Sequence, residues 1–92
     1  MSKSKTIYSP EYIELIDILA SERKRLDLSQ AEVAEQLGLR QTDISKIENK
    51  ERRLDVLELK KLLKIYRVSK NSKLRIAIEN FFIKDNEHEY SS

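Results

Sequence analysis

The chain has 92 residues, with 18 basic and 16 acidic side chains and a formal net charge of +2 at pH 7. This length allows one small domain with one modest core. The absence of cysteine excludes a disulfide framework and a thiolate metal site, and it is compatible with a reducing cytoplasm. One glycine and one proline among many Leu, Ile, Lys and Glu residues indicate an all-α protein.

The sequence shows no signal for a membrane or for export. No apolar run approaches the roughly 18 residues needed to span a bilayer, and no basic and then apolar leader precedes the first expected helix. We therefore expect a cytoplasmic protein that does not bind membranes. The net charge is too small to indicate a nucleic-acid partner by itself, so that inference depends on where the charges lie.

The first expected helix follows a polar, basic segment at residues 1–8, which we expect to be a flexible arm; an arm that wraps DNA is the alternative. Ser9 and Pro10 predict the helix start, because serine caps helices and the fixed φ of proline suits the first helical position. The helix is expected to run to about Leu26. Its predicted core stripe consists of Leu15, Ile16, Leu19 and Ala20.

Residues 28–49 predict two short helices joined by a tight turn. Ser29 is a natural N-cap, and Glu32 at the third helical position completes a capping box. Apolar residues repeat at helical spacing up to Gly38, where a positive φ ends the helix. The pattern restarts two residues later, with Ile44 and Ile47 as the buried pair.

The second of these helices has a polar face opposite its buried pair. At about 100° per residue, this face carries amides, hydroxyls and one ammonium group, and no carboxylate. Those groups form hydrogen bonds with base edges and phosphates. The residues of this face are Gln41, Thr42, Ser45, Lys46 and Asn49.

The stretch resembles the helix-turn-helix of the Cro/C1-type (XRE-like) phage-repressor family, and the resemblance covers roughly residues 15–68. It implies a five-helix, repressor-like domain that binds double-stranded DNA. An ordinary piece of a helical bundle is the alternative. The residues that carry the resemblance are Leu28-Ser29-Gln30, Val33-Ala34, Leu37-Gly38-Leu39 and Ile44-Ser45-Lys46-Ile47-Glu48-Asn49.

The resemblance also implies roles for individual side chains. An arginine at the position of Arg23 pairs in this family with a glutamate at the position of Glu48, which would fix where the recognition helix sits. The expected base-edge contacts are Gln41, Thr42, Ser45 and Lys46. The expected phosphate contacts are Ser29, Gln30, Arg40, Asn49, Lys50, Arg52 and Arg53.

Two positions depart from glycine, which the family often has there. Asp27 stands at the first, and aspartate tolerates a left-handed conformation better than most residues. Lys50 stands at the second, so either Lys50 or Asn49 must take the strained conformation, and asparagine does so more easily.

Three helix N-termini share one six-residue pattern. An aliphatic residue before the cap packs against another at the fourth helical position as a hydrophobic staple, and an acid stands at the third helical position. The copies begin at Leu28, Leu39 and Leu54. The middle copy has Arg40 at the cap, where serine or threonine is expected, at a cost of about 1 kcal/mol. One hypothesis is that Arg40 is retained to contact a phosphate; sequence drift is the alternative.

Two further helices complete the domain, which we expect to span residues 9–83. The fourth is capped by Asp55 and runs to about Arg67, with Val56, Leu59, Leu62, Leu63 and Tyr66 available to the core. The fifth, residues 72–83, has too many apolar residues for one narrow stripe. We expect part of the surplus to form a dimer surface, and a helix that simply caps the domain is the alternative. The expected dimer residues are Ile76, Phe82 and Ile83.

The remaining sequence carries no chemistry that we can identify. Residues 84–92 predict a disordered tail, and His88 in it has no second metal ligand nearby. No nucleophile elbow, phosphate loop, metal-ligand cluster or paired carboxylate indicates an enzyme. We therefore expect no catalytic residue, no metal and no cofactor.

The sequence predicts a transcription regulator that binds double-stranded DNA specifically, a repressor acting as a homodimer on a two-fold symmetric operator. One alternative is an antitoxin, or another interaction protein of a small operon, that binds a partner such as a toxin and uses its helix-turn-helix for autoregulation. Another is a helix-turn-helix that binds RNA or a protein.

Overall fold

The computed structural model describes residues 9–84, and this part of the chain is all-helical, as predicted. It has five α-helices and no strand. The elements are α1 (Pro10–Arg25), α2 (Gln30–Leu37), α3 (Gln41–Glu48), α4 (Val56–Ile65), the 3₁₀ turn η2 (Val68–Lys70), α5 (Ser72–Glu79) and the π-helical turn η3 (Asn80–Lys84).

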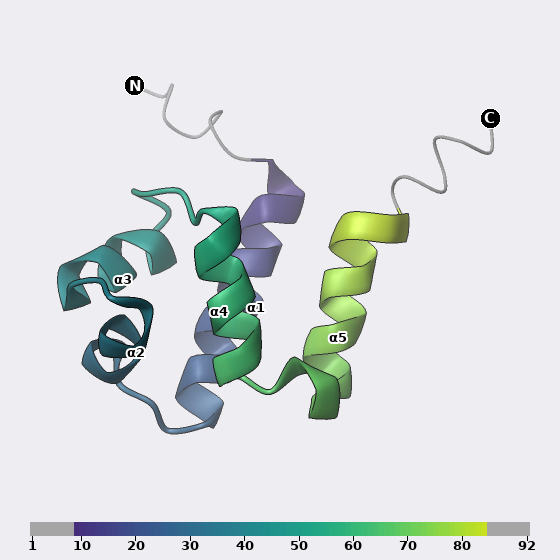
Figure 1. The fold of residues 1–92 in the computed structure, drawn as a ribbon. Coiled ribbons are helices and arrows are strands. Elements are labelled where there is room, and N and C mark those ends of the chain that lie inside the picture. The colour runs from purple at the N-terminus through teal and green to yellow at the C-terminus, as the bar shows by residue number, and fades with distance from the viewer. Residues whose placement is uncertain (1–8, 85–92) are drawn as a thin grey trace.

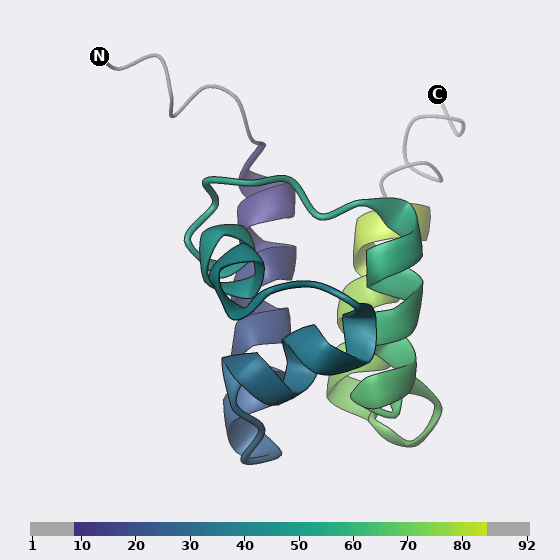
Figure 2. The same cartoon turned by 60° about the vertical axis from the view of Figure 1, so that its left-hand side comes forward.

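Helices α1 and α4 lie in the middle of the molecule, with α2 and α3 on one side and α5 on the other (Figure 1). Helix α2 packs against α3 and α4, while α1 contacts both α3 and α5. The second view shows the connection from α3 passing over one end of the molecule to the start of α4 (Figure 2). The helix-turn-helix pair is therefore supported from behind by α1 and α4.

Side chains cap the helices at the predicted positions. The Ser9 hydroxyl accepts a hydrogen bond from the Tyr12 amide at 3.1 Å. Ser29 and Glu32 form the reciprocal capping box, with distances of 3.0 and 2.8 Å. Asp55 accepts from the second and third backbone amides of α4, those of Leu57 and Glu58. These hydrogen bonds satisfy amides that a helix start would otherwise leave unpaired.

All five α-helices contribute residues to one apolar core, and most of these residues belong to the apolar stripes predicted from the sequence. Val56 is an exception, because 73% of its surface is exposed, and its assignment to the core was wrong. The helical stripe that meets the core begins at Leu59 and continues through Leu62 and Tyr66. Val56 is the first residue of α4, and it lies beside Lys60 and Leu63 at the surface of the helix.

Among residues 9–84, three non-glycine residues have a positive φ: Asp27 at 61°, Lys50 at 63° and Arg67 at 55°. The first was predicted. At the second site, of the two alternatives expected, the less favoured one is found: Asn49 is the C-cap of α3 with φ −90°, and Lys50 makes the left-handed turn. That turn lets the amide of Glu51 reach back to the carbonyl of Lys46 at 2.8 Å, as at other helix ends.

Two short elements flank α5. The 3₁₀ turn η2 lies where a polar connection was expected, and η3 ends at Lys84. The predicted arm at residues 1–8 and the rest of the predicted tail lie outside the described residues. Within residues 9–84, no helix combines the length and the apolar character that crossing a membrane requires.

Candidate nucleic-acid interface

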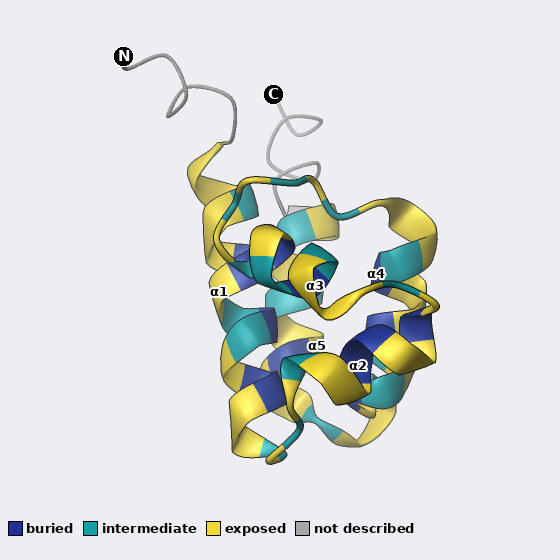
Figure 3. Cartoon of the chain, turned by 90° about the vertical axis from the view of Figure 1, so that its left-hand side faces the viewer, coloured by how far each residue is buried: buried dark blue, intermediate teal, exposed yellow. Residues whose placement is uncertain are grey.

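The outer face of α3 carries the four predicted base-edge residues. Gln41, Thr42 and Lys46 are exposed and Ser45 is partly exposed, whereas Ile44 and Ile47 on the opposite face are buried. The view onto α2 and α3 shows exposed turns of both helices toward the viewer (Figure 3). A polar surface is thus presented by a helix whose other side is anchored in the core.

Gln41 and Gln30 are joined by their amide groups. Gln41 Nε2 donates to Gln30 Oε1 at 2.7 Å, and Gln30 Nε2 donates to Glu48 Oε1 at 3.0 Å. The link leaves the Oε1 atom of Gln41 and its second amide hydrogen for another partner. Gln30, which we predicted to lie near a phosphate, therefore also orients a side chain on the base-edge face.

The structure brings Arg23 and Glu48 together. Arg23 Nε lies 2.7 Å from Glu48 Oε2 and Arg23 Nη2 lies 3.0 Å from Oε1, while Nη1 donates to the Leu28 carbonyl at 2.8 Å. Only 10% and 14% of the two side chains are exposed. The hydrogen bonds to Glu48 raise the pKa of Arg23 although burial opposes the rise. Burial raises the pKa of the neighbouring Tyr66, and the charge of Glu48 adds to this rise.

Arg40 is the N-cap of α3, and its side chain makes no capping hydrogen bond. Its backbone amide donates to Asp43 Oδ2 at 3.0 Å, and this bond lowers the pKa of Asp43. The Arg40 side chain is 83% exposed, with Nε 3.5 Å from the same oxygen. The guanidinium therefore lies largely in solvent beside the start of α3. Ser29, at the start of α2, is also exposed, but its hydroxyl serves its own cap.

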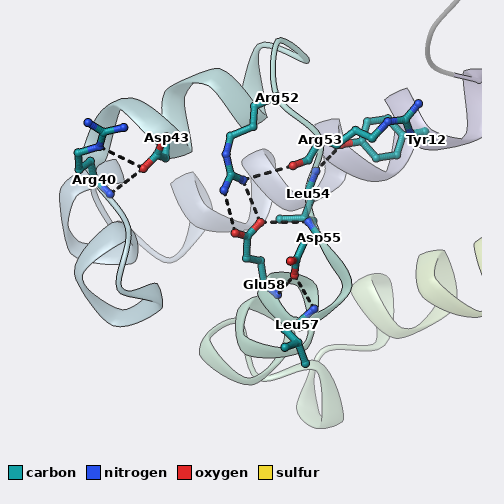
Figure 4. Close-up of polar contacts among 9 residues, drawn as sticks. All are labelled: Tyr12, Arg40, Asp43, Arg52, Arg53, Leu54, Asp55, Leu57 and Glu58. Carbon is teal, nitrogen blue, oxygen red and sulfur yellow. Dashed lines mark hydrogen bonds and ion pairs between the residues drawn. The ribbon is translucent and has the colours of Figure 1, made fainter.

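The connection between α3 and α4, residues 49–55, holds four of the predicted phosphate contacts. Asn49 and Arg53 are exposed. Lys50 forms an ion pair with Asp17 of α1. Arg52 is turned toward α4, where Nη1 and Nη2 lie 2.9 and 3.0 Å from the two carboxylate oxygens of Glu58 (Figure 4). The structure thus gives Lys50 and Arg52 partners inside the chain that the sequence analysis did not foresee.

Glu22 was missed by the sequence analysis, although only 1% of it is exposed. Its Oε1 accepts from Arg25 Nε at 2.9 Å and from Asn71 Nδ2 at 2.7 Å, and Asn71 caps α5 by accepting from the Leu74 amide. Burial raises the pKa of Glu22, but the hydrogen bonds from Asn71 and Arg25 outweigh it, so the pKa is lowered. The available signal was its spacing of three residues from Leu19, within the core stripe of α1.

The three predicted dimer residues are exposed, Ile76 at 54%, Phe82 at 44% and Ile83 at 50%. Phe81, beside them, is partly buried against the core, and its ring meets Phe82 edge to face at 4.8 Å between centroids. Exposed apolar side chains also occur at the start of α4, in the same end of the molecule where α5 ends (Figures 1 and 2). These are Val56 and Leu57, and neither was predicted to be exposed.

Comparison with known proteins agrees with this geometry. A family model described as helix-turn-helix matches residues 19–71, which is more than half of the chain. The match includes all of α2, α3 and α4 and the C-terminal part of α1. No curated protein matches the chain.

Proposed function

The chain belongs to the Cro/C1-type helix-turn-helix family of DNA-binding transcription regulators, and we propose that it is a repressor that binds a two-fold symmetric operator as a homodimer. The observation that supports this most directly is the outer face of α3, which is polar and exposed while its inner face is buried. A helix of this kind fits the major groove, where each base pair presents a distinct pattern of donors and acceptors.

The recognition face has chemistry suited to purines. In the proposed complex Lys46 donates to guanine O6 or N7, and the amide of Gln41 pairs with adenine N6 and N7. Gln30 holds the Gln41 amide in one orientation, which lowers the entropy lost when that amide meets a base. Thr42 and Ser45 supply hydroxyls that can act as donors or acceptors.

Phosphate contacts flank this face in the proposed complex. The first backbone amides of α2, next to Ser29 and Gln30, point out of the helix start and suit a phosphate oxygen. Arg40, Asn49, Lys50 and Arg53 lie beside α3 and add side-chain contacts. Lys50 would keep Asp17 as a neighbour in the free protein and exchange it for a phosphate on binding. Arg52 instead pairs with Glu58 of α4.

The dimer follows from what one recognition helix can read. A single helix contacts only a few base pairs, too few to select one site in a genome. Two domains related by a two-fold axis read two half-sites about 34 Å apart, and they need a self-complementary surface away from α3. Ile76, Phe82 and Ile83 on α5 and η3 are exposed and apolar, and α5 lies on the far side of α1 and α4 from α3 (Figure 1).

Selection of bound sequences from a random duplex pool tests this function. We expect an enriched motif with two-fold symmetry. A symmetric motif supports the homodimer, and an asymmetric one contradicts it. Equal binding to every duplex, or preferential binding to RNA, would overturn the specific regulator. A second small protein that copurifies in fixed ratio and prevents homodimerisation would instead favour the antitoxin alternative.

A further inference from the structure

Side-chain hydrogen bonds attach the connection between α3 and α4 to α1 and to α4, and none of the side chains that form them lies on the recognition face. We infer that Tyr12, Arg52 and Glu58 are positioning residues that hold residues 49–55 in the shape needed at the DNA backbone, and that Arg52 is not itself a phosphate contact. This inference rests on the proposed function, because it concerns how that function obtains its affinity.

Arg52 and Glu58 form the first tie. Two parallel hydrogen bonds of 2.9 and 3.0 Å join the guanidinium to the carboxylate, and 33% and 14% of the side chains are exposed. The same carboxylate accepts from the Asp55 amide at 3.0 Å, which places it in the capping box of α4. The hydrogen bonds from Arg52 lower the pKa of Glu58. Glu58 thus connects Arg52 in the connection to the first turn of α4.

Tyr12 forms the second tie. Its hydroxyl oxygen accepts from the Leu54 amide at 3.0 Å, across 42 residues of sequence (Figure 4). This bond attaches the last residue before the α4 cap to α1. An amide at this point has no helix or sheet partner, so a side chain from another element has to satisfy it or water does.

The two ties enclose Arg53, which lies between them in sequence and is exposed. Arg52 Nη1 also lies 3.3 Å from the Arg53 carbonyl, so the same guanidinium contacts the backbone of that residue. Free connections lose conformational entropy when a ligand orders them, at about 1–2 kcal/mol per backbone residue. A connection that is already ordered avoids much of this loss when Arg53 and Lys50 meet a phosphate.

The direction in which Glu58→Gln changes the affinity for DNA distinguishes a positioning role from a purely electrostatic effect. Glu58→Gln removes a negative charge near DNA, so charge alone would strengthen binding to any duplex. The amide can still accept from the Asp55 backbone, but it loses one of the two bonds to Arg52. If Glu58 is a positioning residue, the variant binds the selected duplex more weakly, by about three- to tenfold, in the range seen for coupled neighbouring residues.

Arg52→Lys gives a second test. Lysine keeps the charge but cannot form the paired hydrogen bonds, so it fails at a bidentate site and serves well at a phosphate. We expect this variant to bind about as weakly as Glu58→Gln. Tyr12→Phe changes no charge and should also weaken binding. Glu35→Gln, at an exposed position on α2 away from the proposed dimer surface, is the matched control for charge removal and should bind no more weakly than the wild type.

Each variant is measured twice, for affinity to the selected duplex and for amide hydrogen exchange of the free protein. We expect faster exchange at Leu54 and Asp55 in the variants, with unchanged protection in the core of α1. Unchanged exchange in residues 49–55 would overturn the inference whether or not the chain binds DNA. Faster exchange with wild-type affinity in Glu58→Gln, or wild-type affinity in Arg52→Lys, would overturn it as well. A wild type that binds no duplex refutes the proposed function, whereas the exchange result still decides whether the ties exist.

Discussion

Arg23 of α1 and Glu48 at the end of α3 hold each other through two parallel hydrogen bonds of 2.7 and 3.0 Å. Gln30 shares the same carboxylate, and Gln30 in turn holds Gln41 on the recognition face. The position of the recognition helix and the orientation of one of its side chains therefore depend on one ion pair at the edge of the core.

Arg23→Ala should destabilise the fold by about 3 kcal/mol or more, because it leaves the Glu48 carboxylate largely buried without its partner. Denaturant unfolding monitored by circular dichroism measures this loss. Glu48→Ala should have a similar effect, and the double variant should lose much less than the sum of the two. Additive losses in this cycle would show that the pair contributes nothing as a pair.

Gln41→Ala and Lys46→Ala should each relax the preference for one base per half-site, at a cost of roughly 1–3 kcal/mol in specific binding. Folding should be unaffected, since both side chains are exposed. Titrations against the selected duplex and its single-base variants give the preference. If both variants keep the wild-type preference at every position, α3 does not read base edges through these residues.

Arg53→Gln should weaken binding to all duplexes alike, because a phosphate contact carries no sequence information. The slope of log K against log salt should fall by about 0.9 for one lost contact. Lys70→Gln, an exposed position in η2, removes the same charge far along the chain and serves as the control. Equal slopes for Arg53→Gln and the wild type would place this side chain away from the DNA.

Glu22 should make stability depend on pH. Its folded pKa lies below the ordinary value of 4.5. The stabilisation is therefore fully present above that value and is lost as the pH falls through the folded pKa. Denaturant titration gives the free energy of unfolding between about pH 3 and pH 7, the range in which carboxylates titrate. As the pH falls, this free energy should decline less steeply in Glu22→Gln than in the wild type. Glu35→Gln at an exposed site should follow the wild type, and a Glu22→Gln curve with the wild-type slope would refute the prediction.

Ile76→Glu and Ile83→Glu should dissociate the proposed homodimer, since each buries an unpaired carboxylate in an apolar contact. Sedimentation at micromolar concentration measures the association, and circular dichroism checks the fold. Gln36→Glu adds the same charge at an exposed site on α2 and should leave association unchanged. A wild type that stays monomeric even on a duplex with two half-sites would contradict the homodimer. Unfolding of either variant would assign its isoleucine to the core.

Local spacing was enough to predict the helices and the exposed face of α3. Ser9, Ser29 and Asp55 bond to amides two or three residues ahead, so a short stretch of sequence contains both partners. Ile44 and Ile47 define the buried side of α3 by their own spacing, and the polar face follows from helical geometry. The pairing of Arg23 with Glu48 was expected only from the family resemblance.

Tertiary structure decided which partner each remaining polar side chain has. Asn71 reaches Glu22 across 49 residues, and the Leu54 amide reaches Tyr12 across 42. Such contacts depend on the angles at which helices pack, which spacing along one helix does not contain. Even Arg52 and Glu58, only six residues apart, meet because the chain changes direction between them, where Asp55 caps α4. A charged residue in a connection can face solvent or a neighbour, and only the packed fold selects between the two.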